Sequence, residues 1–528
     1  MDFDLHDMPY ANGARFDPDK GCLPRTREMI IEEIIQWVNS PNGDDVARIF
    51  FLSGVAGSGK SAIAHTITKL FDLQKRLGSS YCFDIADQVN RRPNNVLSTI
   101  ALDIADLDHH WKASLSNIVK GNRSLRTTLS VTEQFKNFIL DPAKALTTVG
   151  PILLVIDGLD ESGEAPSRKA LLAILAKRVS ELPSNFRFLI TARPERDIVD
   201  AFNDNRHIFC KYMDAIDEVS NEADITLFIE TQLSDIRSLD LKWPNKLWCR
   251  LLTQSSGGLF QWASTACRAV QDGKPGLQPA ERLDRFVSLA DGLDGLYLEI
   301  LSQAFDEKDD TIMSRFQLVM GRILATREPL SVSAHSELLS DDDPAGSVES
   351  ILTGLGSLLS GVNQRHVPVR ALHASFFDFL TIHNRSKSYY VDPLQHSRSL
   401  TLSCMRVMKS GLRFNICNLE TSHCRNTDIP DLTIRVEKTI LPHLSYGSRF
   451  WADHLGATAY DTDILSEVRD FFHHYLLYWL EVLSLIKKVN MASGMLLSVL
   501  DWNQVSQNAV YNILPLTSKL TVLCSEQY

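Results

Sequence analysis

The sequence lacks paired cysteines, a long apolar run and an excess of positive charge. Its nine cysteines are scattered singly, with no CxxC pair, which excludes a disulfide framework and favours reduced thiols in a cytoplasmic protein. The most apolar stretch, at 471–489, is interrupted by Glu481, Lys487 and Lys488 and falls short of the ~18 apolar residues that a membrane span requires. A net charge of −11 argues against a general nucleic-acid binder.

The N-terminus also lacks the apolar segment of a secretory signal. Residues 1–20 are rich in Asp, Pro and Gly, and we expect them to form a disordered tail. The 528 residues, with 44% hydrophobic and 23% charged, are typical of a globular protein of two to four domains.

Short apolar stretches alternate with helical patterns from residue 46 to about residue 210. Strands are predicted within RIFFLS (48–53), SSYCFDI (79–85), GPILLVIDGLDE (150–161) and NFRFLITARPE (185–195). This alternation predicts a parallel sheet flanked by helices. A helix with Thr26 as its N-cap is expected before the first strand. After Lys211 the pattern is nearly all helical, apart from a predicted β-ribbon within QRHVPVRALHASFFDFL (364–380).

The segment GVAGSGKS, at 54–61, fits the phosphate-loop pattern G-x-x-x-x-G-K-[ST] without a mismatch. Its glycines allow successive N–H groups to face a polyphosphate, and the following helix offers its positive end to the same anion. A chance glycine turn is disfavoured, because a strand precedes the loop and a helix follows it. The residues expected to hold the nucleotide here are Gly54, Val55, Ala56, Gly57, Ser58, Gly59, Lys60, Ser61 and Ala62.

Two of these side chains have predicted roles in chemistry. Lys60 can reach the β- and γ-phosphates, and the Ser61 hydroxyl can ligate Mg²⁺. A magnesium-bound triphosphate also needs a carboxylate at the end of a neighbouring strand. Asp157 is the predicted metal-side acid, acting through a bound water, and Asp160 or Glu161 is predicted to orient or deprotonate an attacking water. A single strand-end Asp more often forms a turn, but three acids beside a phosphate loop favour function.

Arg193 follows the strand within 185–195 and is predicted to sense the γ-phosphate, because a guanidinium matches phosphate oxygens. A solvated surface arginine is the alternative interpretation.

These motifs together resemble a NACHT-type NTPase of the STAND class, most closely the fungal set of such proteins. GCLPRTREMIIEEI resembles the family's entry segment, VIDGLDE its acidic strand, ITARPE its sensor strand and ALHASFFDFL its winged-helix signature. The resemblance implies an α/β P-loop NTPase core at 21–210, a helical lid at 211–299, a winged helix at 300–395 and a helical C-terminal domain at 396–528.

The resemblance implies a cytoplasmic switch that binds ATP or GTP with Mg²⁺, hydrolyses it slowly and self-associates in the triphosphate state. His373 would touch the β-phosphate in the closed form, and Thr26 and Arg27 would lie over the base; Arg25 replaces the family's usual glycine. Fungal innate immunity or non-self recognition, with an unidentified protein partner, would be the setting. No effector domain or repeat sensor is recognised, and NILPLTSKLTVLCSEQY (512–528) resembles no known module, so a complete receptor is not predicted.

Two other functions stay open. A non-catalytic scaffold would keep nucleotide as a structural ligand and bind a protein through its helical half. A metabolic P-loop kinase would need an acceptor pocket, of which the helical second half gives no sign.

Overall fold

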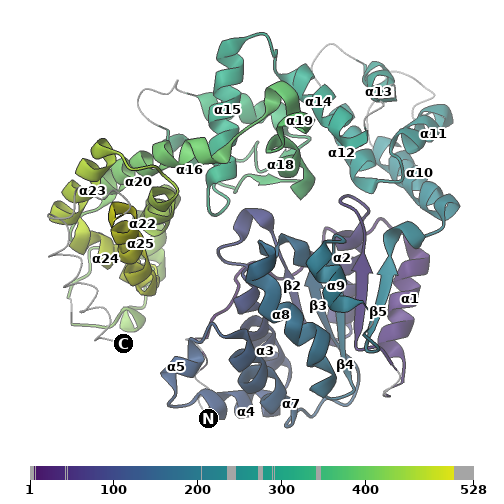
Figure 1. Ribbon diagram of the computed structural model, residues 1–528, viewed down its shortest axis with the longest axis horizontal. Coiled ribbons are helices and arrows are strands. Elements are labelled where there is room, and N and C mark those ends of the chain that lie inside the picture. The colour runs from purple at the N-terminus through teal and green to yellow at the C-terminus, as the bar shows by residue number, and fades with distance from the viewer. Residues whose placement is uncertain are drawn as a thin grey trace. The chain divides into compact units, whose positions relative to one another are not determined.

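The computed structural model describes residues 5, 8–41, 43, 46–203, 205–234, 245–271, 278–287, 289, 292–339, 346–421 and 423–504. The segment 512–528 therefore lies outside the described residues. The chain divides into two compact units, one of residues 1–300 with His373–Ser375 and one of 301–372 with 376–528. Each unit is described by itself (Figure 1).

A five-stranded parallel sheet forms the centre of the first unit, in the order β2-β3-β4-β1-β5 (Figure 1). The strands are β1 (Ile49–Ser53), β2 (Leu77–Cys82), β3 (Ile152–Asp157), β4 (Phe186–Ala192) and β5 (Ile208–Tyr212). The predicted parallel α/β sheet is confirmed. Sequence patterns missed β5, because this edge strand is half-exposed and mixes Phe209 with Lys211 instead of forming a continuous apolar run.

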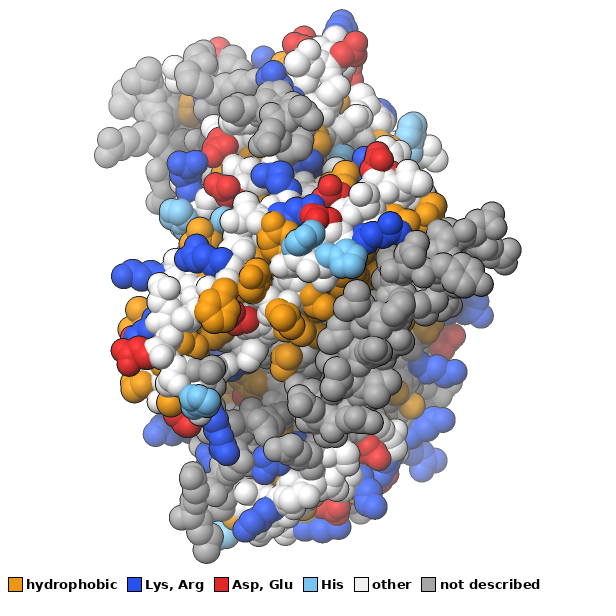
Figure 2. All heavy atoms as spheres, turned by 90° about the vertical axis from the view of Figure 1, so that its left-hand side faces the viewer, with side chains coloured by type: hydrophobic (Ala, Val, Ile, Leu, Met, Phe, Trp, Pro, Cys, Tyr) orange, Lys and Arg blue, Asp and Glu red, His pale blue; other side chains and the backbone are white. Residues whose placement is uncertain are grey.

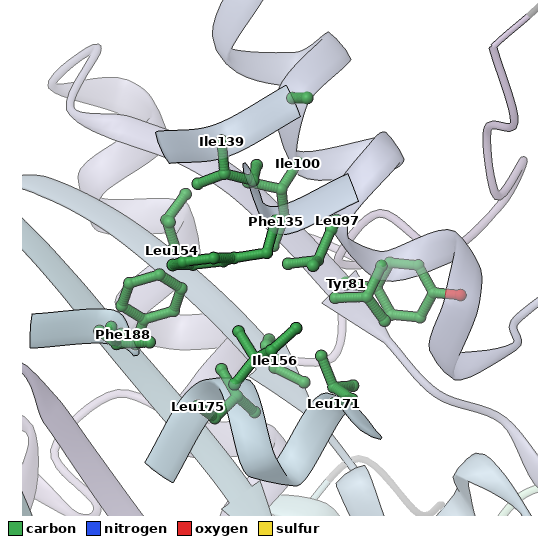
Figure 3. Packing of buried hydrophobic residues seen from close by; sticks show 14 of the residues in the cluster. Tyr81, Leu97, Ile100, Phe135, Ile139, Leu154, Ile156, Leu171, Leu175 and Phe188 are labelled. Atoms are coloured by element: carbon green, nitrogen blue, oxygen red, sulfur yellow. The ribbon is translucent and has the colours of Figure 1, made fainter. Parts of the chain in front are cut away.

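The two faces of the sheet bury alternate residues of each strand, as the two-residue period of a strand requires. Phe50 and Leu52 of β1 pack in the core shared with α1 (Glu28–Asn39) and α2 (Lys60–Leu73). Ile49 and Phe51 pack in the core on the opposite face. Figure 3 shows that second core, where Leu154, Ile156 and Phe188 of the sheet meet side chains such as Leu97, Phe135 and Leu171 from the covering helices.

Both cores depend on helices that connect the strands or follow them. The α-helices that follow in the first unit are α3 (Val96–Leu107), α4 (His109–Val119), α5 (Arg123–Arg126), α6 (Val131–Gln134), α7 (Asp141–Ala143), α8 (Ala165–Lys177), α9 (Arg196–Phe202), α10 (Glu218–Ser234), α11 (Lys246–Ser255), α12 (Phe260–Gln271) and α13 (Pro279–Val287). The boundary between the two units falls within α14 (Gly292–Ala304). A π-helical segment, Phe135–Leu140, continues α6.

Helix α1 begins differently from the prediction. Arg27, not Thr26, precedes its first residue, with φ of 61° and no side-chain cap. The Thr26 hydroxyl instead donates to the Leu23 carbonyl at 2.7 Å. Arg25 also has a positive φ, 69°. Glycine adopts this left-handed backbone conformation at lower cost than other residues. A glycine therefore suits this position in the family that the segment resembles.

Residues 8–17, here called the N-terminal strap, pack on the sheet, in contrast to the disordered tail expected for 1–20. Met8, Ala11 and Ala14 are buried in the core around α3. The Cys82 N–H donates to the Ala14 carbonyl at 2.7 Å, so the strap lies beside edge strand β2. The high content of Asp, Gly and Pro predicts disorder, and the composition does not reveal that the apolar residues between them are buried.

The second unit is mostly helical. Its elements are α15 (Asp310–Ala325), α16 (Val332–Glu337), α17 (Ser347–Leu352), β6 (Leu359–Ser360), β7 (Arg370–Ala371), α18 (Ala374–Leu380), α19 (His383–Ser386), α20 (Ser397–Gly411), α21 (Leu432–Thr439), α22 (Pro442–Gly456), α23 (Thr462–His474), α24 (Leu476–Leu485) and α25 (Ala492–Gln504). The first two residues of α18 belong to the first unit. The antiparallel pair β6 and β7 forms a short ribbon near the predicted position. The winged-helix assignment remains a prediction.

Buried aromatic rings organise the C-terminal helices. Trp451 of α22 lies against Phe471 of α23 and Trp479 of α24, with ring centroids 5.3 and 6.2 Å away. The apolar stretch at 471–489 is thus divided between two short helices. Among the described residues, no helix has the length and apolarity to cross a membrane. On the face that Figure 2 shows, apolar side chains gather among histidines and charged groups.

Candidate functional site

The loop at 54–59 joins β1 to α2 and has the backbone that its glycines predict. Gly57 and Gly59 have φ values of 81° and 95°, in the left-handed region. Gly54 is close-packed, because an added Cβ would lie 2.6 Å from the Met213 Cβ. The loop leads directly into the N-terminus of α2, which begins at Lys60. This strand–loop–helix geometry is what an anion-binding loop requires.

The Lys60 ammonium lies against the loop itself. Its Nζ donates to the carbonyls of Gly54 and Val55, at 2.7 and 2.9 Å. Burial lowers the pKa of Lys60, and the nearby carboxylates of Asp160 and Asp157 oppose that effect. The structure thus brings the lysine and both acids into one electrostatic environment. Ser61, the next residue, is exposed at the start of α2.

The carboxyl ends of β3 and β4 are tied together. The Thr191 hydroxyl donates to Asp157 at 2.5 Å and accepts a hydrogen bond from the Gly158 N–H at 3.0 Å. Asp157 is buried. Because parallel strands end at the same edge of a sheet, the acid that ends β3 lies beside the polar end of β4, as the sequence predicts.

Asp160 and Glu161 have different environments, which the sequence could not distinguish. Asp160 forms an ion pair with Arg193, with Oδ2 and Nε 3.1 Å apart. Glu161 accepts a hydrogen bond from the Ile85 N–H at 3.2 Å. Burial, followed by the charge of Asp160, raises the pKa of Glu161 to about 8. At neutral pH Glu161 is therefore largely protonated in this form of the protein.

Arg168 is an essential part of this region that sequence patterns missed. Its guanidinium is 2% exposed and donates to Asp197 through Nε and Nη2, both at 2.8 Å, and to Glu195. The same group donates to the carbonyls of Asp160 and Gly163. Arg168 thus connects the loops that follow β3 and β4. An arginine in a polar helical turn carries no distinguishing signal in a single sequence.

The entry segment places Arg27 on the phosphate loop. Nη2 of Arg27 donates to the Ser58 carbonyl at 2.9 Å, and the guanidinium lies 4.7 Å from the centre of the Phe260 ring. The backbone N–H of Arg27 donates to Asp224 of α10 at 2.9 Å. Nε and Nη1 are buried and have no hydrogen-bond partner within the described chain. Burial lowers the pKa of Arg27. These nitrogens suit an oxygen-rich ligand.

Thr26 faces another surface. It lines an open hollow of about 640 Å³, with Cys22, Arg25 and Thr66 among the other lining residues. Arg27 donates to the phosphate loop and Thr26 lines this hollow, and the expected position of both residues over a base stays a prediction.

Helix α12 docks on the phosphate loop through its first turn. The Gln261 N–H donates to the Gly57 carbonyl at 3.1 Å. A Cβ added to Gly57 would lie 2.6 Å from the Gln261 Cβ. The glycine therefore serves both the loop conformation and the approach of α12. This contact was not predicted, because the phosphate-loop pattern explains its glycines without reference to a second element.

His373 belongs to the first unit. Its Nδ1 lies 2.6 Å from the Ser375 hydroxyl, which in turn lies 2.9 Å from the Tyr297 hydroxyl. Burial, together with the positive charges of Arg193 and Lys60, lowers the pKa of His373 to about 4. The imidazole is therefore neutral and shares an electrostatic environment with the loop lysine.

A family model matches the part of the chain that carries this site. Residues 25–193 match the family model described as "Nephrocystin 3, N-terminal". That match spans the entry segment, the phosphate loop and the strand ends up to Arg193. No curated protein sequence matches the chain.

Solved structures show weaker likeness. A STAND protein with a tetratricopeptide repeat sensor from Pyrococcus horikoshii is 13% identical, with 90% of this chain and 70% of that one covered and a TM-score of 0.35. A Walker-type ATPase of Pyrococcus abyssi is 12% identical, with 70% of this chain and 97% of that one covered and a TM-score of 0.30. TM-scores this low do not establish a shared fold.

Proposed function

We propose that the first unit binds a nucleoside triphosphate with Mg²⁺ and hydrolyses it slowly, as a conformational switch. One observation carries the proposal: the Lys60 ammonium lies on the phosphate loop, within the electrostatic influence of the acids at the end of β3 and of Arg193 after β4, and Arg27 and α12 contact the same loop. Positioning and electrostatic stabilisation are the main contributions that a protein makes to phosphoryl transfer.

Each side chain has a role in this proposal. Lys60 leaves the loop carbonyls for the β- and γ-phosphates, and Ser61 and Asp157 hold Mg²⁺, the latter through water. Magnesium would supply charge neutralisation at the phosphates. Glu161 directs the attacking water, and Asp160 holds Arg193 until nucleotide is bound. Arg193 turns toward the γ-phosphate when nucleotide is bound.

Nucleotide would bias the docking of α12 and His373. A phosphate that occupies the loop competes for the Arg27 guanidinium, which donates to the Ser58 carbonyl and lies against Phe260 of α12, so bound and free forms favour different packings. We propose that the triphosphate form self-associates. The sequence resemblance suggests a role in fungal innate immunity or non-self recognition, with ATP or GTP as the ligand.

Two measurements test the proposal: the first identifies the bound nucleotide, and the second asks whether the phosphate loop binds it. Mass spectrometry of the nucleotide retained by the purified chain reports both base and phosphorylation state. Equilibrium binding to Lys60→Ala should be weakened at least about 100-fold, since charge-assisted phosphate contacts are lost. Lys69→Ala is the matched control, because Lys69 is exposed on the same helix and donates to the Pro18 carbonyl instead of to the phosphate loop. Equal affinity of Lys60→Ala and parent would refute the proposal.

A non-catalytic scaffold is favoured by one observation, the raised pKa of Glu161, since a protonated carboxyl is a poor base. Phosphate release separates the two functions. Hydrolysis that is abolished in Glu161→Gln and retained in the exposed neighbour Glu164→Gln supports the switch. Nucleotide that is bound but never hydrolysed by the parent supports the scaffold.

A further inference from the structure

Three buried side chains of different chemistry meet behind the phosphate loop. His65, Cys82 and Asp157 each present one ligand atom, and these atoms lie within 4.8 Å of one another. Cys82 and Asp157 are paired in the register of β2 and β3, so both side chains leave the same face of the sheet. Helix α2 covers that face and carries His65 one turn after Ser61.

We propose that this trio is a binding site for a thiophilic divalent cation of the Zn²⁺ type. An imidazole, a thiolate and a carboxylate are a ligand set for zinc, with a fourth position left for water, whereas Mg²⁺ prefers oxygen ligands alone. Zinc–ligand bonds of about 2.0–2.3 Å place tetrahedral ligand atoms roughly 3.3–3.8 Å apart. The three side chains therefore need only small rotamer adjustments to share one ion.

The N-terminal strap contacts one of the three ligand side chains. Nδ1 of His65 accepts a hydrogen bond from the Asp17 N–H at 3.1 Å. Coordination through Nδ1 replaces this bond directly. Coordination through Nε2 moves the ring proton to Nδ1, which then cannot accept. Metal binding and this strap contact therefore exclude each other. The thiol proton of Cys82 leaves to solvent when the cation binds.

The site would also regulate the nucleotide site, a consequence that rests on the proposed function. One oxygen of Asp157 accepts the Thr191 hydroxyl. A cation bound by the carboxylate with His65 and Cys82 holds Asp157 away from the magnesium-bound water. Zinc is therefore an inhibitor that competes with magnesium–nucleotide through Asp157.

Cobalt(II) is the probe for the metal site itself. The nucleotide-free full chain should bind one Co²⁺ and show thiolate-to-cobalt charge-transfer absorption. Cys22→Ser, a change at a half-buried thiol outside the trio, should retain the band, and Cys82→Ser should lose it and bind Zn²⁺ at least about tenfold more weakly. Unfolding by urea in EDTA verifies that Cys82→Ser folds, and His65→Asn provides a second variant expected to lose the metal.

Two outcomes would overturn the site: a parent protein without the charge-transfer band, or a band of equal strength in Cys82→Ser. Faster hydrogen exchange of the Asp17 amide upon zinc addition supports the strap exchange, and unchanged protection refutes it.

Nucleotide titrations test the regulatory consequence. Zinc should raise the Kd of magnesium–nucleotide in the parent and leave it unchanged in Cys82→Ser. An equal zinc effect in both proteins refutes the competition. If the protein shows the cobalt absorption but binds no nucleotide, the proposed function is refuted and the metal site is supported. If it binds nucleotide but shows no cobalt absorption, the metal site is refuted and the proposed function is supported.

Discussion

Arg193 binds Asp160 twice. Its Nε lies 3.1 Å from one carboxylate oxygen, and its backbone N–H donates to the other at 2.9 Å. The Asp160 side chain is only 5% exposed. One carboxylate thus connects the loops after β3 and β4. The Arg193 side chain itself is 26% exposed.

Removing the guanidinium should therefore destabilise the first unit. Arg193→Gln leaves a buried carboxylate without its charged partner, and we expect unfolding in urea to show a loss of about 1–3 kcal/mol. Arg196→Gln is the control, since its ion pair with Asp200 is 95% and 67% exposed and should contribute less than about 0.5 kcal/mol. Equal midpoints for the two variants would contradict the structural importance of the pair.

Gly57→Ala should disrupt the loop and the docking of α12 together. The residue has a positive φ, and an added methyl group would overlap the Gln261 side chain. We expect a loss of stability of about 1–3 kcal/mol and, under the proposed function, weaker nucleotide binding. Gly150→Ala is the matched control, because an added Cβ there meets no atom within 4 Å. Thermal unfolding of the two variants measures the difference. A Gly57→Ala protein as stable as Gly150→Ala would contradict the close approach of α12.

Glu161 should make stability depend on pH. Its pKa is raised in the folded protein to about 8, chiefly by burial, so the folded chain retains a proton that the unfolded chain releases near its ordinary value. Stability from this group is complete at low pH and is lost as pH rises from about 4.5 to 8.

Glu161→Gln removes this dependence, so the variant should gain stability relative to the parent between pH 5 and pH 8. Since the side chain is partly exposed, the gain should be on the order of 1–2 kcal/mol. Urea unfolding at both pH values measures it. A constant difference between variant and parent would show that Glu161 titrates normally.

The first unit was more predictable than the site that it carries. Buried strands such as β1 and β3 have continuous apolar sequences, and the phosphate loop has a fixed pattern of residue types, so both could be recognised locally. The proximity of Asp157 to Thr191 follows from parallel strands alone. The edge strand β5 and the N-terminal strap lack such a pattern, because β5 mixes Phe209 with Lys211 and the strap spaces its apolar residues among Asp, Gly and Pro.

Contacts between distant segments could not be predicted. The stacking of Arg27 on Phe260 joins residues far apart in sequence, and the buried network of Arg168 depends on loops that meet only in three dimensions. The roles proposed for Lys60, Asp157, Glu161 and His373 remain predictions until ligand binding is measured.

The strap beside β2 has a practical consequence. A recombinant fragment that starts at the entry segment, near residue 21, would leave the outer strand of the sheet with unpaired N–H and C=O groups. An exposed edge strand of this kind can pair with a strand of another chain and cause aggregation. Preparations of that fragment should therefore precipitate, and any cloning design should retain everything from Met8 onward.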